Sequence, residues 1–179
     1  MFTVFNEEGK YQLVEEPDPS LSYTYTDYLQ WNFEERLELI RGRIFKMSPA
    51  PNTTHQKISF RLSIILSPCL KKNCQVFIAR FDVSLPVKNR KKDYEVNTVV
   101  QPYLCVLCDE SKLDERGCCG APDLMVEILS PGNTRKEMRI KPKLYEESGV
   151  KEYWIISQVK ENVMVFVLDE QENMQRQKI

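Results

Sequence analysis

The sequence lacks any long apolar run, and none of its hydrophobic stretches approaches the roughly 20 residues that a helix needs to cross a bilayer. The first eleven residues include Glu7 and Glu8 and have no basic start followed by an apolar core, unlike a secretory signal. We therefore expect a cytoplasmic protein. A reducing compartment would keep its six cysteines as free thiols.

Net charge is also nearly absent, because the 25 basic residues almost balance the 26 acidic ones and the formal charge is -1. A dedicated nucleic-acid-binding domain is usually basic overall, so composition alone does not favour DNA. The one concentrated basic stretch is a predicted loop that contains Lys88, Arg90, Lys91 and Lys92. Such a loop either contacts phosphates or is simply solvated.

Internal repeats and low-complexity linkers are absent as well. A length of 179 residues fits one domain, with residues 1–23 as an entry segment. Apolar residues make up 42% and charged residues 28%, which is ordinary for a soluble globular protein. We expect a single domain, 1–179, with its own core.

Histidine is scarce, and the cysteines do not form a clear metal-binding pattern. The only histidine, His55, begins a predicted helix, where a structural hydrogen bond is the expected role. Cys105-x-x-Cys108 and the pair Cys118-Cys119 could be interpreted as four zinc ligands. An odd spacing within an apolar strand sends Cys105 and Cys108 to opposite faces, which favours buried thiols.

The apolar spacing predicts an α/β (α+β) fold built on a mixed central sheet. Strands that are apolar on both faces lie centrally in a sheet that is covered on both sides. We expect one long helix on one side and a second helix on the other. The predicted helices cover residues 25–29, about 53–70 and 137–148, a hairpin covers 36–47, and strands cover 75–79, 81–85, 98–108, 124–129, 153–156 and 163–168, before a polar tail.

Asp123 and Glu127 lie in the most informative stretch, residues 120–131. They are four residues apart in a predicted strand, so they would point to the same face. An ionised carboxylate in an apolar strand is costly unless a cation or hydrogen-bond donors compensate it, and hard cations prefer carboxylate oxygens. The pattern favours a divalent metal. The alternative is that Asp123 caps the strand entrance and only Glu127 points inward.

Glu38 and Lys141 are two further candidates. Glu38 lies between two leucines of the hairpin, so alternation puts it on the opposite face, either solvated or in a site. Lys141 follows the acidic strand and shares a helical face with Glu137 and Tyr145. It either forms a surface ion pair with Glu137 or leans over the sheet to stabilise charge on a phosphate.

Several short blocks, in order along about 24–156, carry a family resemblance. They are 37–42 (LELIRG), 47–49 (MSP), 55–56 (HQ), 81–83 (FDV), 100–102 (VQP), 120–123 (GAPD), 127–131 (EILSP), Lys141 with Tyr145, 149–150 (GV) and 152–154 (EYW). Together they resemble the Uma-two family of restriction-type endonucleases, in the PD-(D/E)XK nuclease superfamily. The resemblance implies a restriction-endonuclease-like mixed sheet flanked by helices.

The resemblance also implies residue roles. Glu38 matches an acidic residue near the first helix and hairpin, Glu127 the acidic residue of the third motif, and Lys141 a lysine contributed by a helix. The aspartate of the second motif should follow 101–102, but Tyr103 stands there, and a neutral phenol is a poor ligand for a hard cation. A further family acid is replaced by Ser157.

The implied activity is hydrolysis of phosphodiester bonds in double-stranded DNA, with Mg²⁺ or Mn²⁺ as cofactor and a homodimer as a further expectation. Asp123 and Glu127 would hold the metal, Glu38 would be a further ligand, and Lys141 would orient the attacking water or stabilise the developing charge. The alternative is a catalytically inactive relative that keeps the fold and binds DNA or protein.

Overall fold

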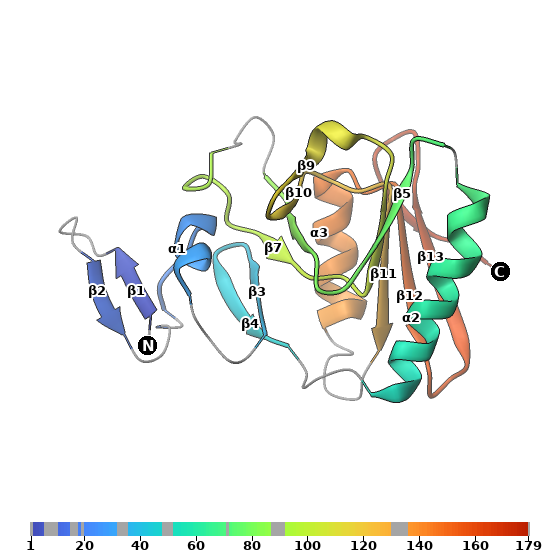
Figure 1. The fold of residues 1–179 in the computed structure, drawn as a ribbon, viewed down its shortest axis with the longest axis horizontal. Helices are drawn as coiled ribbons and strands as arrows, with labels where there is room; N and C mark the ends of the chain where they lie inside the picture. The colour runs from blue at the N-terminus through green and yellow to red at the C-terminus, as the bar shows by residue number, and fades with distance from the viewer. Residues whose placement is uncertain are drawn as a thin grey trace.

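In the part of the chain that it describes, the computed structural model contains two six-stranded mixed sheets, one two-stranded sheet and three α-helices (Figure 1). The structure describes residues 2–5, 11–14, 18, 20–31, 36–47, 52–70, 72–86, 92–129 and 136–178. The helices are α1 (Tyr25–Gln30), α2 (Thr53–Leu66) and α3 (Lys141–Ser148). A short antiparallel pair, β1 (Phe2–Phe5) and β2 (Tyr11–Val14), forms a third sheet.

The main sheet has the strand order β14-β13-β12-β11-β8-β5. Only β11 and β12 run parallel, and α3 lies in the connection between them, as a parallel crossover requires. The strands are β5 (Gln75–Ile78), β8 (Leu104–Leu107), β11 (Leu124–Leu129), β12 (Glu152–Ser157), β13 (Asn162–Leu168) and β14 (Met174–Arg176).

The second sheet has the strand order β4-β3-β7-β6-β10-β9, in which only β6 and β10 run parallel. Its first two strands form the hairpin predicted for residues 36–47, with a turn at Arg41 and Gly42, both of which have positive φ. The strands are β3 (Leu37–Ile40), β4 (Arg43–Lys46), β6 (Asp82–Ser84), β7 (Val99–Val100), β9 (Leu113–Asp114) and β10 (Gly117–Cys119).

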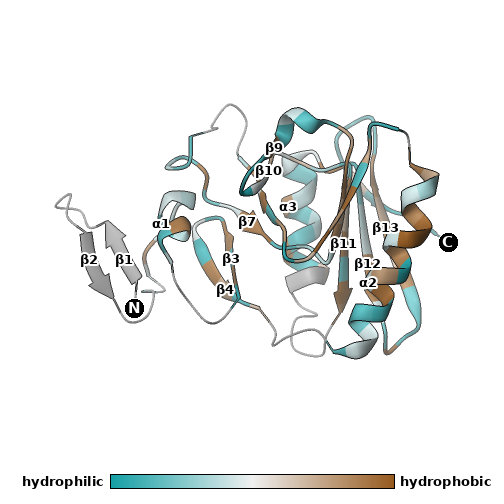
Figure 2. Ribbon diagram, in the orientation of Figure 1, coloured by the Kyte–Doolittle hydropathy of each residue, from teal (hydrophilic) through white to brown (hydrophobic). Residues whose placement is uncertain are grey.

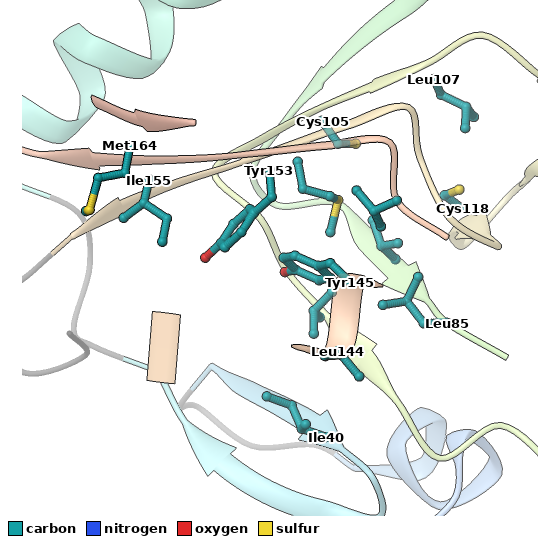
Figure 3. Packing of buried hydrophobic residues seen from close by; sticks show 14 residues of the cluster. Ile40, Leu85, Cys105, Leu107, Cys118, Leu144, Tyr145, Tyr153, Ile155 and Met164 are labelled. Carbon is teal, nitrogen blue, oxygen red and sulfur yellow. The ribbon is translucent and has the colours of Figure 1, made fainter. Parts of the chain in front are cut away.

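The helices cover opposite faces of the main sheet, as predicted. Ile58, Leu62 and Leu66 of α2 pack on one face, beside Val106 and Val126. Residues of α3 pack on the other face, where Tyr145 meets Tyr153 edge-on at 4.7 Å between ring centroids (Figure 3). Ile40, Val83 and Val100 from the second sheet join this cluster, so α3 packs against both sheets.

Helix boundaries follow the local chemistry. Thr24 caps α1 in a capping box with Asp27, and Asn52 caps α2 by accepting from the backbone N–H of His55. The predicted helix over 53–70 ends earlier, at Leu66, because Pro68 lies in a following 3₁₀ turn, Ser67–Cys69. The predicted helix over 137–148 is a π turn, Lys136–Ile140, followed by α3, which ends at Gly149 with φ of +80°.

One predicted strand is wrong. Residues 98–108 do not form a continuous strand, because β7 belongs to the second sheet and β8 to the main sheet. Gln101, Pro102 and Tyr103 carry the chain from one sheet to the other. Proline lacks the N–H that a central strand needs, which explains why the ladder breaks here. The polar tail also contributes a strand that the sequence did not predict, β14.

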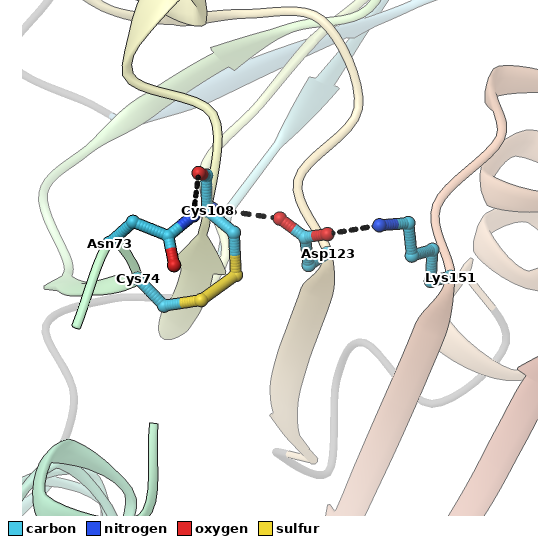
Figure 4. Close-up of a disulfide and its surroundings, with 5 residues drawn as sticks. All are labelled: Asn73, Cys74, Cys108, Asp123 and Lys151. Atoms are coloured by element: carbon cyan, nitrogen blue, oxygen red, sulfur yellow. Dashed lines mark hydrogen bonds and ion pairs between the residues drawn. A yellow bond between two sulfur atoms is a disulfide. The ribbon is translucent and has the colours of Figure 1, made fainter. Parts of the chain in front are cut away.

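The expectation that all six cysteines are free thiols is also wrong, because Cys74 and Cys108 form a disulfide (Figure 4). They extend the pairing of β5 with β8, in which Gln75 lies opposite Leu107, so the next residues out face each other. The two cysteines are 34 residues apart in the sequence, so no local pattern predicts their pairing. Cys105 and Cys108 lie on opposite faces of β8, as expected, and Cys105 is a buried thiol.

Candidate active site

Glu38, Glu127 and Lys141 form a buried ion-pair triad, and each has an exposed side-chain fraction of 2% or less. The Nζ of Lys141 donates to Oε1 of Glu38 at 2.8 Å and also to Oε1 of Glu127. The residues come from β3, β11 and the start of α3. The triad therefore joins the second sheet, the main sheet and the helix that packs against both.

Strand alternation accounts for the direction of Glu127. Its neighbours Val126 and Ile128 belong to the cluster beneath α2, while Met125 belongs to the cluster beneath α3. Glu127 therefore points to the α3 side, where Lys141 begins the helix. Lys141 is buried with Tyr145, its neighbour one turn later, and its ammonium pairs with the two sheet carboxylates, so of the two alternatives the structure favours the one in which Lys141 leans over the sheet.

Electrostatics explains why these three groups are together. Two ionised carboxylates in an apolar interior repel each other and lose their hydration, which costs several kcal/mol in a typical protein. The ammonium of Lys141 lies between them and offsets both costs. The backbone N–H of Gln101 also donates to Oε1 of Glu38 at 3.1 Å. With both carboxylates ionised, the three groups together have a formal charge of -1.

A second polar cluster adjoins the triad through Gln101. Its side-chain Nε2 donates to Asp82 at 2.7 Å and to the Tyr28 hydroxyl at 3.1 Å. Its Oε1 accepts from two nitrogens of Arg36, at 3.1 and 3.2 Å. Gln101 thus links α1, β6 and the start of β3 to the backbone position that holds Glu38.

Sequence reasoning did not single out Asp82 as a site residue, although 81–83 is one of the blocks that carry the family resemblance. Burial raises the pKa of Asp82 above its ordinary value, while hydrogen bonds from Gln101 and Tyr28 and the charge of Arg36 oppose that shift. Burial also raises the pKa of the Tyr28 phenol. The signal for Asp82 was its place between Phe81 and Val83, an acid within an apolar strand.

Asp123 has a different set of partners from Glu127. Its carboxylate accepts from the Cys108 backbone N–H at 2.8 Å and from Lys151 Nζ at 2.6 Å (Figure 4). Burial favours a higher pKa for Asp123, but the bonds from Lys151 and Cys108 outweigh it and lower the pKa. Four strand residues span about 13 Å, so these contacts correspond to the alternative role of Asp123, a cap at the entrance of β11.

Tyr103 occupies the place where the family aspartate was expected, beside Glu127. Its backbone N–H donates to the Val126 carbonyl at 3.1 Å, which continues the pairing of β8 with β11. Its ring, however, stacks on His55 at 5.3 Å and joins the cluster beneath α2, on the face opposite Glu127. The side chain at this position is therefore turned away from the triad.

The remaining candidates lie outside the triad. The Nδ1 of His55 contacts the Asn52 side chain at 2.9 Å, in keeping with the cap role expected for His55. Ser157 accepts from the backbone N–H of Lys160 in the turn after β12. Lys92 lies 5.6 Å from the centre of the Tyr94 ring. The other basic loop candidates lie outside the described residues: Lys88, Arg90 and Lys91.

Glu38 and Glu127 are the residues that could hold a small divalent cation. Two carboxylate oxygens converge on one cationic group, so both would reach an ion placed near the position of Lys141 Nζ. Mg²⁺ is commonly bound by one or two carboxylates, with waters and substrate phosphates as its other ligands. Within the described part of the chain, no group of three or more His, Cys, Asp or Glu side chains is arranged to hold a metal ion. Glu38 and Glu127 are thus a partial ligand set.

The arrangement of two mixed sheets flanked by helices is shared with a solved structure. A solved structure from Anabaena variabilis ATCC 29413, titled a "putative nuclease belonging to DUF820", is similar, with a TM-score of 0.65 over 86% of this chain and 83% of that one. The two sequences are 19% identical, so this likeness concerns the fold. No curated protein matches the chain.

The family is defined by the sequence itself. Residues 25–179 match the Uma2 family, described as "Putative restriction endonuclease". The match covers most of the chain, so this protein belongs to the Uma2 family. Among the described residues, every helix is too short or too polar to cross a membrane.

Proposed function

We propose that this chain is a metal-dependent endonuclease that hydrolyses phosphodiester bonds of double-stranded DNA. The observation that carries the proposal is the convergence of two buried carboxylates and one buried lysine, from three separate elements, on a single point. Membership of a restriction-endonuclease family supports the substrate class. Glu38 and Glu127 would hold Mg²⁺ or Mn²⁺, which when bound polarises a phosphate oxygen and lowers the pKa of a coordinated water.

The roles of the chain's own residues follow from their contacts. Lys141 carries N–H donors between the two carboxylates, so its ammonium is the group that would meet negative charge developing on a phosphate. The Gln101 N–H holds Glu38 in position. Because all three triad side chains are buried, a DNA strand reaches them only if the chain that covers them opens. Asp123 would stabilise the entrance of β11 and would not hold the ion.

A second candidate is a catalytically inactive relative that binds DNA or protein through the same fold. The orientation of Tyr103 favours it, because no carboxylate occupies that position and the ring packs on His55. The position of Lys141 favours it too, since its ammonium already occupies the place between the two carboxylates.

Plasmid nicking distinguishes the candidates. The purified chain is incubated with supercoiled plasmid and Mg²⁺ or Mn²⁺, beside a Glu127→Gln variant and a Lys143→Met control on the exposed side of α3. Nicking by the native chain and the control, but not by Glu127→Gln, supports the nuclease. Nicking that appears only with Tyr103→Asp indicates a degenerate enzyme. Nicking that Glu127→Gln retains shows that the activity belongs to another site or to a contaminant.

A further inference from the structure

The outer edge of the main sheet is open at β5. On its inner side β5 pairs with β8, and the backbone N–H of Ala79 donates to the Tyr103 carbonyl at 3.1 Å. Because backbone groups alternate in direction along an antiparallel strand, those of Val76 and Ile78 point away from β8. Within the described part of the chain, no residue forms a backbone hydrogen bond with them.

An exposed apolar surface adjoins this edge. Phe60 and Ile64 of α2 are 63% and 56% exposed, and Ile78 of β5 is 49% exposed. Part of α2 is coloured as hydrophobic in Figure 2. A groove of about 550 Å³ separates the end of α2 from β5, and its lining is Ser63, Ile64, Ser67, Pro68, Val76 and Ile78.

Neither the strand nor the groove carries charge. Natural sheets protect open edges with lysines, prolines, bulges or covering loops, because an unprotected edge pairs with other strands. The β5 sequence, Gln75 to Ile78, has none of the protecting residue types, and every residue that lines the groove is uncharged. The basic residues of α2, Lys57 and Arg61, lie N-terminal to the groove. This edge therefore suits a partner that offers both a strand and an apolar surface.

We propose that the partner is a second copy of this chain, docked edge to edge through β5 with α2 beside the α2 of its partner. A two-fold axis at Phe77 places Val76 opposite Ile78 of the other copy, so that each outward N–H meets an outward carbonyl. Such an interface is isologous, and one patch supplies both halves. The docking extends the main sheet across the two copies and covers the groove.

The buried area supports a stable pair. At exposures of 49–63%, each of the three apolar side chains leaves on the order of 100 Å² open to solvent. In a two-fold interface these residues alone would remove on the order of 600 Å² from water, more than a third of a standard protein interface. The strand backbone and the groove lining supply the rest. This surface is separate from the triad, so the dimer does not depend on nuclease activity.

Sedimentation equilibrium of the full chain over a wide range of concentrations tests the proposal. The native chain is expected to be a dimer at high concentration. Ile78→Lys and Phe60→Glu are each expected to raise the dimer Kd at least about 100-fold, because a symmetric interface carries every substitution twice. Val163→Lys is the matched control, since Val163 is 44% exposed but lies in β13, four strands away from β5 in the same sheet.

A further variant tests the strand pairing itself. Ile78→Pro removes one outward N–H while leaving the bonds to β8, and proline is tolerated on an edge strand whose N–H faces solvent. It is expected to weaken the dimer without a large change in Tm. A native chain that stays monomeric at every concentration overturns the proposal. So does a dimer that Ile78→Lys, Phe60→Glu and Ile78→Pro leave intact while their folds, checked by circular dichroism, are native.

Discussion

The substitution Lys141→Met tests the physical basis of the buried triad. It removes the ammonium group that lies between Glu38 and Glu127 while keeping a side chain of similar length. Breaking one partner of a buried ion pair typically costs about 3–5 kcal/mol, because the remaining charges are left uncompensated. In a chain of this size, each kcal/mol lowers Tm by about 2–4 °C, so the expected loss is roughly 6–20 °C.

Lys143→Met is the matched control for this prediction. Lys143 lies two residues further along α3, and its side chain is 61% exposed and paired with Glu146 at 2.6 Å. Exposed pairs contribute about 0–1 kcal/mol, so the control should change Tm by only a few degrees. Thermal unfolding followed by circular dichroism and by calorimetry measures both variants under identical conditions.

A charge-free triad separates lost charge balance from lost packing. Combining Lys141→Met with Glu38→Gln and Glu127→Gln removes every charge of the triad, and neutral replacements of buried ion networks are often tolerated. The combined variant should recover at least half of the Tm lost by Lys141→Met. If Lys141→Met unfolds no earlier than Lys143→Met, the lysine does not neutralise the two carboxylates, and the argument for the site fails.

Three further predictions concern other parts of the fold. Hydrogen bonds from Lys151 and Cys108 lower the folded-state pKa of Asp123, so the ionised carboxylate stabilises the fold above its unfolded pKa and loses that effect as pH falls through the folded pKa. The Tm difference between the native chain and Asp123→Asn should therefore shrink in acid. A Tm difference that does not change with pH would contradict these contacts. Cys74→Ser should lower the free energy of unfolding by about 2–4 kcal/mol in urea titrations without reductant, and dithiothreitol should remove the difference; equal stability before reduction would show that the disulfide does not form. Gly42→Ala should lower Tm more than Gly149→Ala. Both glycines have positive φ, but of the two only a Cβ at Gly42 would meet neighbouring atoms, with Ser22 Oγ at 2.1 Å. Equal losses of Tm would mean that the Ser22 side chain moves away freely.

Local patterns predicted the elements better than their partners. The hairpin over 36–47 and the start of the helix at Thr53 depend on chemistry within a few residues, and the structure confirms both. The prediction of one strand over 98–108 was wrong because an apolar run does not reveal which sheet each half joins. The 34-residue separation between Cys74 and Cys108 likewise leaves no local signal of their pairing.

The candidate site shows the same division. An acid among apolar neighbours correctly marked Glu127 as inward-facing, whereas for Glu38 the sequence left a solvated position and a site position open, and the structure buries it fully. That Lys141 joins them could not be read from helical spacing, since 103 residues separate it from Glu38 and spacing alone suggested Glu137 as its partner. Asp123 shares the sequence pattern of Glu127, yet its place at the strand entrance gives it Lys151 as partner.

The triad stabilises the fold and is also the proposed catalytic centre, and these two roles require different positions of the Lys141 ammonium. As a structural bond, the ammonium must stay between Glu38 and Glu127, where it compensates buried charge and ties α3 to both sheets. As part of a nuclease, it must share that space with a divalent cation, which brings more positive charge to the same oxygens. A bound ion would therefore displace the ammonium toward the phosphate, while the extra positive charge keeps the carboxylates compensated. Divalent metal should consequently raise the Tm of the native chain and restore much of the Tm lost in Lys141→Met. It should leave the Tm of Glu127→Gln unchanged.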